Sequence, residues 1–477
     1  MKKITIILSS IIFIVITITF LAPIQSAIHN ASYREETVVI DDESFTLLSY
    51  GGNTNGLLTS ESRIFSWGTN TLYQVGNNDT TAVKVPTNIS AFYTLNAGEV
   101  ITQVSYGGDT NGFLTSENRI FSWGRNSNGS VGNNDTTTVQ VPTDISTFYT
   151  LNEGETITQI SYGGSTNGFL TSENRIFSWG VNTYGAVGNN DTTAVQVPTD
   201  ISTFYTLNED EVITQISYGA TTNSFLTSDN RIFSWGRNDA YQVGNNDTVN
   251  VLIPTDISSF YTLNEGETIT QISYGNYTNG FLTSENRIFS WGANSDYQVG
   301  NNDTVAVQVP TDISSFYTLN EGEVITQISY GGATNGFLTS EKRIFSWGRN
   351  TTGSVGNNDT ADVQVPTDIS TFYTLNTGEV ITQISYGGDS NGFITDKTRI
   401  FSWGANNVGQ VGNNDTTAVQ VPTDITTFLD SVLNEGYTTT IEVERNSTIT
   451  RLLTVLPLII VGAVVVLTVT IGFKKEN

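Results

Sequence analysis

Short apolar runs separated by clusters of Gly, Asn, Asp and Pro fill the middle of the chain, and the stretch that begins at Glu155 shows the pattern well. Its runs are rich in Ile, Val, Thr, Phe and Tyr, which is typical of β-strands, and no helical period of useful length interrupts them. The pattern predicts four strands, in ITQISYG (157–163), GFLTS (168–172), RIFSWG (175–180) and AVQVP (194–198). We expect a tight hairpin at Glu173 and Asn174, between the second and third strands.

The third strand places large side chains on both faces of its sheet. Ile176 and Ser178 point to one face, whereas Phe177 and Trp179 point to the other. A sheet that lies between two other sheets needs this arrangement. Pro198 lies at the end of the fourth strand, and because proline has no N–H donor, we expect that strand at the edge of its sheet.

The pattern recurs with a fixed period. The tryptophans lie 56 residues apart, at Trp67, Trp123, Trp179, Trp235, Trp291, Trp347 and Trp403. Four-stranded sheets that cover one another form a closed ring or an open solenoid, and seven copies favour the ring. We therefore predict an all-β protein with a seven-bladed β-propeller over residues 37–445. We further expect one blade to combine strands from both chain ends, with 37–40 or 438–444 as the closing strand.

The segments SYGG, FLTS, IFSWGxN, xVGNND and VPTD follow one another through the seven copies with small variations. In this order they resemble the regulator of chromosome condensation type repeat, a family that forms seven-bladed β-propellers. Asn111 and Asn167 stand where that family often has histidine, and valine replaces leucine before glycine. The best-known member is a nucleotide exchange factor for a small nuclear GTPase, and its activity is associated with a wedge projecting from one blade. No unit here has an insertion between successive tryptophans.

Both chain ends carry apolar segments. Lys2 and Lys3 precede an apolar run and small residues, which predicts a signal peptide over 1–27, or an uncleaved anchor. Residues 452–473 contain no charge and predict one transmembrane helix, after a juxtamembrane linker at 446–451. Lys474 and Lys475 follow this segment, so the positive-inside rule places a tail at 474–477 in the cytoplasm. The propeller is then extracellular, on a single-pass protein of the cell membrane.

The charge of the chain narrows the choice of partners. The chain has 20 basic and 46 acidic side chains, and its net charge is −26. Four of the basic and one of the acidic side chains lie in the terminal segments, so the part between them carries −29. Such a field repels phosphate backbones, and nucleic-acid binding is not expected. A nuclear exchange factor is not expected either, although the family resemblance raises it as an alternative.

Few residues point to catalysis. Cysteine is absent, and the single histidine, His29, lies outside the repeats, which excludes histidine-dependent catalysis and zinc binding by the propeller. Carboxylates such as Glu117, Asp135 and Glu155 recur in most units, whereas a paired-carboxylate glycosidase needs a site that breaks the symmetry. GNNDT offers oxygen ligands for Ca²⁺, but turn chemistry explains this segment better. We expect no enzyme activity, no metal and no cofactor, with a glycan-active surface enzyme as the alternative.

The copies differ most directly after WG, where they read TNTLYQ, RNSNGS, VNTYGA, RNDAYQ, ANSDYQ, RNTTGS and ANNVGQ. These loops follow equivalent strands, so a propeller gathers them on one face. Tyrosine and arginine favour interfaces, and the candidate binding residues are Tyr73, Arg125, Tyr184, Arg237, Tyr241, Tyr297 and Arg349. The preferred interpretation is a non-catalytic scaffold for adhesion, or for binding a protein or glycan at the cell surface. Neutral drift in a structural coat protein also explains the variation.

Overall fold

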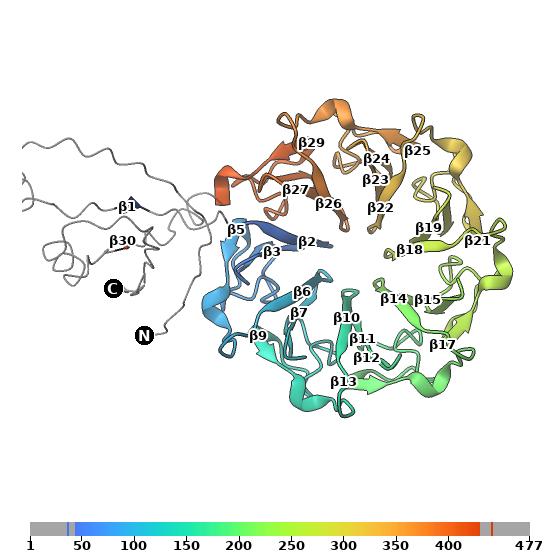
Figure 1. Ribbon diagram of the computed structural model, residues 1–477, viewed down its shortest axis with the longest axis horizontal. Helices are drawn as coiled ribbons and strands as arrows, with labels where there is room; N and C mark the ends of the chain where they lie inside the picture. The colour runs from blue at the N-terminus through green and yellow to red at the C-terminus, as the bar shows by residue number, and fades with distance from the viewer. Residues whose placement is uncertain (1–35, 38–42, 430–439, 442–477) are drawn as a thin grey trace, which may run out of the picture. The chain divides into compact units, whose positions relative to one another are not determined.

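The computed structural model describes residues 36–37, 43–429 and 440–441. Residues 43–429 form seven four-stranded antiparallel sheets around a central axis, so the predicted seven-bladed propeller is confirmed (Figure 1). In a separate unit, β1 (Glu36–Thr37) pairs in antiparallel fashion with β30 (Thr440–Ile441).

Each blade consists of four consecutive strands. Blade 1 contains β2 (Phe45–Gly51), β3 (Thr54–Thr59), β4 (Ile64–Gly68) and β5 (Val83–Asn88), and blade 2 contains β6 (Ile101–Tyr106), β7 (Thr110–Thr115), β8 (Ile120–Gly124) and β9 (Val139–Asp144). Blade 3 contains β10 (Ile157–Tyr162), β11 (Thr166–Thr171), β12 (Ile176–Gly180) and β13 (Val195–Asp200), and blade 4 contains β14 (Ile213–Tyr218), β15 (Thr222–Thr227), β16 (Ile232–Gly236) and β17 (Val251–Asp256). Blades 5 to 7 contain β18 (Ile269–Tyr274), β19 (Thr278–Thr283), β20 (Ile288–Gly292) and β21 (Val307–Asp312); β22 (Ile325–Tyr330), β23 (Thr334–Thr339), β24 (Ile344–Gly348) and β25 (Val363–Asp368); and β26 (Ile381–Tyr386), β27 (Ser390–Thr395), β28 (Ile400–Gly404) and β29 (Val419–Asp424). The outer strands of blades 1 to 6 lead into the 3-10 helices η1 (Ser90–Phe92), η2 (Ser146–Phe148), η3 (Ser202–Phe204), η4 (Ser258–Phe260), η5 (Ser314–Phe316) and η6 (Ser370–Phe372).

Blade 3 shows how local sequence produces these strands. The hairpin between β11 and β12 closes through a hydrogen bond from the Thr171 N–H to the Arg175 carbonyl at 3.0 Å. Asn174 adopts φ 61°, a left-handed conformation that asparagine tolerates better than most residues, so the predicted hairpin position is confirmed. Pro198 lies in β13, the outer edge strand, as its missing N–H predicted. All five residues of β12 are buried, because neighbouring blades cover both faces of the sheet.

The repeated tryptophans hold neighbouring blades together. Trp179 is fully buried, and its indole N–H donates to the Ser130 carbonyl of blade 2 at 2.9 Å. Asn167 is also fully buried and donates its amide to the same carbonyl at 2.7 Å. The Tyr162 ring packs edge-on against Trp179 with centroids 5.9 Å apart. Tryptophan and asparagine therefore form the inter-blade joint, which explains their fixed spacing.

Contacts between the inner strands of the first and last blades close the ring. The Tyr50 N–H of β2 donates to the Ser385 hydroxyl of β26 at 2.8 Å, and the same serine–tyrosine bond occurs at each of the other six seams. The Gln383 side chain also binds Leu48, accepting from its N–H at 2.7 Å and donating to its carbonyl at 2.9 Å. The ring is thus closed by non-covalent contacts alone.

The expectation that one blade combines strands from both chain ends is wrong. Blade 1 takes all four strands from residues 45–88, and blade 7 takes all four from residues 381–424. Each repeat therefore fills its own sheet and leaves no place for a closing strand. The two expected closing segments pair with each other instead, since Thr37 lies opposite Thr440 in the separate sheet.

The seven inner strands differ at the position that forms the amide clamp. Six of them carry the clamping glutamine, whereas β2 carries Leu47 in its place; the glutamines are Gln103, Gln159, Gln215, Gln271, Gln327 and Gln383. Leu47 packs instead against the apolar cluster that includes Val104 of blade 2. The seam between blades 1 and 2 therefore relies on apolar contact where the other seams use an amide clamp.

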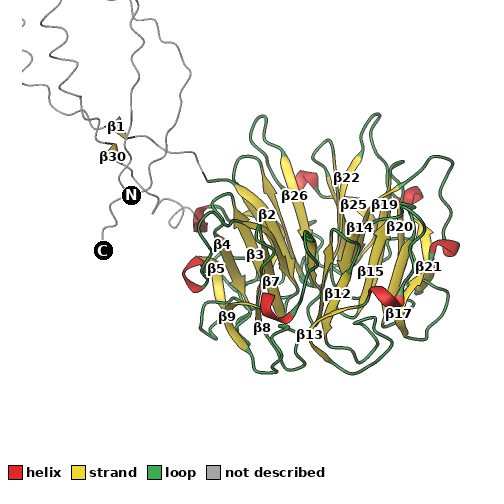
Figure 2. Ribbon diagram, turned by 60° about the horizontal axis from the view of Figure 1, so that its bottom comes forward, coloured by secondary structure: helices red, strands yellow, loops and turns green. Residues whose placement is uncertain are grey.

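The ring has two distinct faces, and its sheets stand side by side between them (Figure 2). We call the loop face the one that carries the turns between the first and second strands of each blade and the loops after WG. The hairpins between the second and third strands lie on the opposite, terminal face, where the Ser44 N–H binds the Ser60 hydroxyl beside the start of β2. Asp424, at the end of β29, binds Arg399 on that same face. The ring therefore begins and ends on the terminal face.

The predicted signal peptide (1–27), linker (446–451), transmembrane helix (452–473) and cytoplasmic tail (474–477) lie outside the described residues. In the part of the chain that is described, no helix is both long and apolar enough to cross a membrane.

Candidate binding surface

One buried asparagine organises each loop after WG. In blade 3 the Asn182 amide donates to the Asn189 side chain and to the carbonyls of Asp191 and Thr193, at 3.0–3.1 Å. Its side-chain oxygen accepts from the Val187 N–H at 2.8 Å. The hydrogen bonds of this asparagine therefore hold the loop backbone, which has no regular secondary structure. The exposed residues beside it do not hold the backbone, so they can differ from copy to copy.

The GNNDT segments form tight turns at the end of these loops, and the Asn190 N–H donates to the Leu252 carbonyl of the next blade at 3.0 Å. The exposed Asp191 accepts from the backbone N–H groups of Thr192 at 2.7 Å and Thr193 at 3.3 Å. These bonds, that of Thr192 foremost, hold the pKa of Asp191 below its usual value. Within residues 43–429, no three acidic or histidine side chains gather in a way that could hold a metal ion. The aspartates stabilise turns, in agreement with the turn interpretation.

The recurring carboxylates on the terminal face form clamps around arginine. Arg175 donates to the buried Glu155 at 2.7 Å and to the half-buried Asp200 at 2.8 Å, and its guanidinium lies 4.6 Å from the Phe177 ring centre. Burial alone would raise the pKa of Glu155, but hydrogen bonds from Thr171 and Asn152 and the charge of Arg175 outweigh it and lower the pKa. A catalytic acid needs a raised pKa, so this pair is arranged for structure.

The structure brings two of the candidate binding residues together. The Arg237 guanidinium of blade 4 lies 5.2 Å from the ring centre of Tyr184 in blade 3. Asp239, which the sequence did not single out, binds Arg237 through both oxygens at 2.7 and 2.8 Å. Tyr241 follows on the same loop with φ 63°.

The other candidates lie in separate blades. Arg125 of blade 2 forms an exposed ion pair with Asp109 at 2.9 Å, and the guanidinium of Arg349 in blade 6 donates to the Thr351 hydroxyl at 3.4 Å. Tyr73 of blade 1 and Tyr297 of blade 5 have φ 60° and 61°. Like Tyr241, they occupy a left-handed position that glycine fills in the remaining four blades.

Sequence reasoning missed a second variable element on the loop face. The turn between the first and second strands reads GN, GD, GS, AT, NY, GA and GD across the copies after its first glycine. Its member in blade 5 contains Tyr277, which is 45% exposed. The variation of these two residues was visible in the sequence, and their position on the loop face follows from the strand order.

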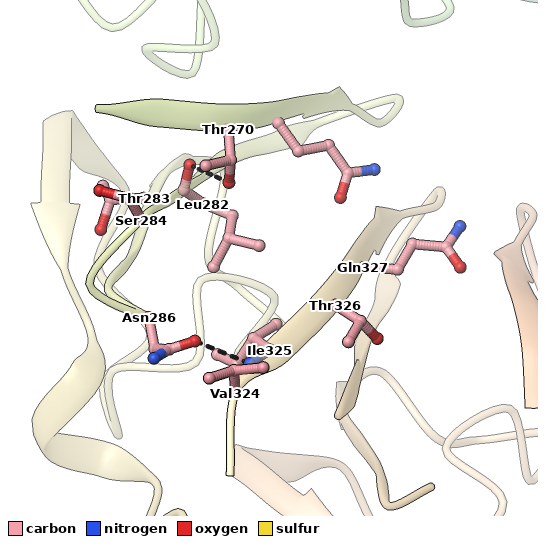
Figure 3. Close-up of a pocket in the computed structure, with 10 residues that line it drawn as sticks. Thr270, Leu282, Thr283, Ser284, Asn286, Val324, Ile325, Thr326 and Gln327 are labelled. Atoms are coloured by element: carbon pink, nitrogen blue, oxygen red, sulfur yellow. Dashed lines mark hydrogen bonds between the residues drawn. The ribbon is translucent and has the colours of Figure 1, made fainter. Parts of the chain in front are cut away.

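A groove lies on the terminal face, between blades 5 and 6 (Figure 3). It measures 590 Å³ and is open, and it is lined by Thr270, Gln271, Leu282, Thr283, Ser284, Asn286, Val324, Ile325, Thr326 and Gln327. The Ile325 N–H donates to Asn286 at 2.7 Å, and the Thr270 hydroxyl donates to the Leu282 carbonyl at 3.2 Å (Figure 3). The asparagine–isoleucine bond recurs at other seams, so the groove is a product of the repeat.

Comparison with known proteins gives consistent results. Residues 93–443 match the RCC1-like domain, and residues 61–114 match the regulator of chromosome condensation (RCC1) repeat. The RCC1 domain-containing protein RUG3, mitochondrial, of Arabidopsis thaliana is 28% identical over 61% of this chain and 62% of its own length, which is less than two thirds. The Ultraviolet-B receptor UVR8 of the same plant is 26% identical over 77% of this chain and 78% of its own length. Human E3 ubiquitin-protein ligase HERC2 is 23% identical over 75% of this chain but only 7% of its own length.

Solved structures share the fold. Human WBSCR16 has a TM-score of 0.64 at 19% identity, over 76% of this chain and 93% of its own. Yeast RCC1 (Prp20), solved bound to Kap60, has a TM-score of 0.65 at 20% identity, over 88% of this chain and 91% of its own.

Proposed function

The chain belongs to the RCC1-like domain family, and from this premise we propose that its propeller is a non-catalytic scaffold that binds a protein or glycan on its loop face, outside the cell. One observation carries the proposal. The inter-blade joints and arginine clamps repeat almost unchanged, whereas the two variable elements of each blade lie together on the loop face. A scaffold requires constant packing, and a binding surface requires local differences.

Relatives support a role in binding. Yeast RCC1 (Prp20) was crystallised with Kap60, and another structure of the same protein was described with its binding to Gsp1p and histones. Those partners belong to that protein. For this chain we propose no nucleotide exchange activity, because its seven tryptophans are evenly spaced and leave no room for a wedge.

The ring geometry supports exposure of the loop face. Because the ring begins and ends on its terminal face, attachment through either end leaves the loop face free of the connection. We propose that 452–473 anchors the protein in the cell membrane, after secretion directed by 1–27. Protease added to intact cells should then cleave the propeller and spare the tail at 474–477.

Cross-linking of the full-length protein on intact cells tests the binding role. Cross-linked partner peptides, mapped by mass spectrometry, should concentrate on the loops after WG and the neighbouring turns. The control is a variant in which all seven loops after WG carry the sequence of one copy, which keeps the scaffold and removes the differences. Unchanged partner binding by this variant rejects the proposal and favours a structural coat protein.

No observation favours the glycan-active enzyme, since Glu155 and its counterparts bind arginine and the aspartates of the GNNDT turns bind backbone N–H groups. Hydrolysis of glycans by the protein, abolished by one acidic substitution, would be needed to support it.

A further inference from the structure

The symmetry of the loop face breaks most strongly across blades 3, 4 and 5. Four side chains gather there, and we call them the aromatic patch: Tyr184, Arg237, Asp239 and Tyr277. The position of Tyr184 holds Leu, Asn, Ala, Asp, Thr or Val in the other copies, and that of Tyr277 holds Asn, Asp, Ser, Thr or Ala. In no other copy do the six residues after WG include both an arginine and an aspartate. The patch therefore occurs once in the ring.

We propose that the aromatic patch binds an uncharged oligosaccharide, with the Tyr277 ring against a sugar and the Arg237–Asp239 pair bound to its hydroxyl groups. This inference deepens the proposed function and rests on it, because it names one ligand class and one place on the loop face.

The central pair is held in a fixed orientation. Nε of Arg237 donates to Oδ1 of Asp239 at 2.8 Å, and Nη2 donates to Oδ2 at 2.7 Å. The Tyr184 ring covers the guanidinium at 5.2 Å, so the flat group is fixed on one side. Nη1 makes no hydrogen bond to the described residues, and 54% of the Asp239 side chain is exposed. Donors and acceptors are therefore available in a planar, rigid arrangement.

Contacts across the seam tie this pair to the turn that carries Tyr277. Asp239 accepts from the Gln242 amide at 3.1 Å. The backbone carbonyl of Gln242 accepts from the Asn279 side-chain amide at 2.7 Å and from the Trp291 indole N–H at 2.9 Å, and both of these residues lie in blade 5. Tyr277 stands two residues before Asn279, at the end of the same turn. Loop and turn thus share one rigid joint, so their side chains keep their separation when a ligand arrives.

The chemistry of the patch fits a sugar. The C–H face of a sugar ring packs against an aromatic ring, and Tyr277, at 45%, is the most exposed aromatic side chain in residues 43–429. Sugar hydroxyls both donate and accept, which suits a carboxylate beside a guanidinium with free hydrogens.

Charge and area favour an uncharged sugar over other ligands. Arg237 and Asp239 cancel each other on a chain of net charge −26, so the surroundings repel anionic glycans and leave neutral ones unaffected. A stable protein partner needs about 1,200–2,000 Å² of buried surface with an apolar core. The other large apolar side chains that the described residues expose are scattered valines, such as Val249 and Val305 on the outer GNNDT turns, and they build no such core.

The test uses full-length protein in detergent and an array of neutral, sulfated and sialylated oligosaccharides, followed by calorimetric titration with the neutral sugars that bind. We expect binding to neutral sugars, weakened at least tenfold by Tyr277→Ala and by Asp239→Asn. The matched control is Asp229→Asn, which changes an exposed carboxylate in the hairpin between β15 and β16 of the same blade, on the terminal face, and should leave affinity unchanged. Equal melting temperatures establish that each variant is folded.

Three results overturn the inference: no neutral sugar binds, only anionic glycans bind, or Tyr277→Ala binds as the parent does. Cross-linking on intact cells separates these failures from failure of the proposed function. If Tyr277→Ala removes a captured protein and no sugar binds, the patch is a protein contact and the scaffold role stands. If the single-copy loop variant keeps every cross-link, the scaffold role fails as well.

Discussion

We predict that Arg399→Met destabilises the protein by about 3–5 kcal/mol, because it leaves a buried carboxylate without its cation. The side chain of Glu379 is 0% exposed. One of its oxygens accepts from the Thr395 hydroxyl at 2.6 Å, and the other accepts from the Asn376 N–H at 2.7 Å and from Arg399 at 2.8 Å. Methionine keeps much of the packing against Phe401, whose ring centre lies 4.5 Å from the guanidinium carbon, so the loss is mainly electrostatic.

The pH dependence of this loss identifies its cause. Burial alone would raise the pKa of Glu379, but hydrogen bonds from Thr395 and Asn376, with the hydrogen bond and charge of Arg399, lower it. A lowered pKa in the folded state stabilises the protein above the ordinary carboxylate pKa of 4.5, and this contribution is lost as the pH falls through the folded value. Loss of the cation raises the pKa of Glu379 in the folded variant above that in the parent, so the deficit should be largest at pH 7 and should shrink as falling pH protonates this carboxylate first in the variant and then in the parent.

Urea unfolding of the full-length protein at several pH values measures the effect. Adding Glu379→Gln to Arg399→Met should recover most of the loss, because a neutral amide needs no cation. Asp424→Asn is the matched control, since Asp424 also lies 2.8 Å from Arg399 but is 35% exposed and should cost less than about 1 kcal/mol. If Arg399→Met costs no more than Asp424→Asn at pH 7, the buried pair does not stabilise the blade as reasoned.

Three further predictions concern the seams and the clamps. Gly163→Ala should destabilise more than Gly154→Ala, because a Cβ at Gly163 would lie 2.0 Å from the Gly219 carbonyl oxygen, whereas one at Gly154 meets nothing within 4 Å and brings only the backbone strain of φ 84°; melting temperatures of the two variants check this. Gln215→Leu should cost about 1–3 kcal/mol in urea unfolding, because it removes both hydrogen bonds to Ile272, and an unchanged midpoint would show that solvent replaces them fully. The melting temperature of the parent should stay level from pH 8 to 5 and fall below pH 4.5, because Glu155 and its counterparts have lowered pKa values; a fall that begins above pH 5 would contradict this.

The strands were predictable because each depends on residues close in sequence. The alternation around Trp179, the turn preference of Asn174 and the missing N–H of Pro198 each act within one sheet, and the structure confirms all three. The closing strand was not predictable in the same way. A closing strand is needed only if the chain enters the first blade after that blade's first strand. The repeated pattern is the same in every copy and does not show at which strand the first blade begins.

The residues of the candidate binding surface were also predictable only in part. Tyr184 and Arg237 were chosen for their residue type, but 53 positions separate them, and only the ring places one loop against the next. Asp239 and Tyr277 escaped notice because aspartate is ordinary in a loop and the turn before Asn279 is short. The pairing across a seam depends on the number and tilt of the blades, which no single repeat encodes.

Because every blade is made from one continuous segment, the gene can lose or gain whole repeats without dividing a sheet. Deletion or duplication of one 56-residue unit leaves every remaining blade complete, and each new junction again joins a glutamine- or leucine-bearing inner strand to its neighbour. Propellers with a blade shared between both ends cannot lose or gain a unit at the shared position without breaking a sheet. Unequal recombination that keeps the 56-residue period therefore yields complete sheets, and the new first and last blades must then form the contact that Tyr50 and Ser385 make here.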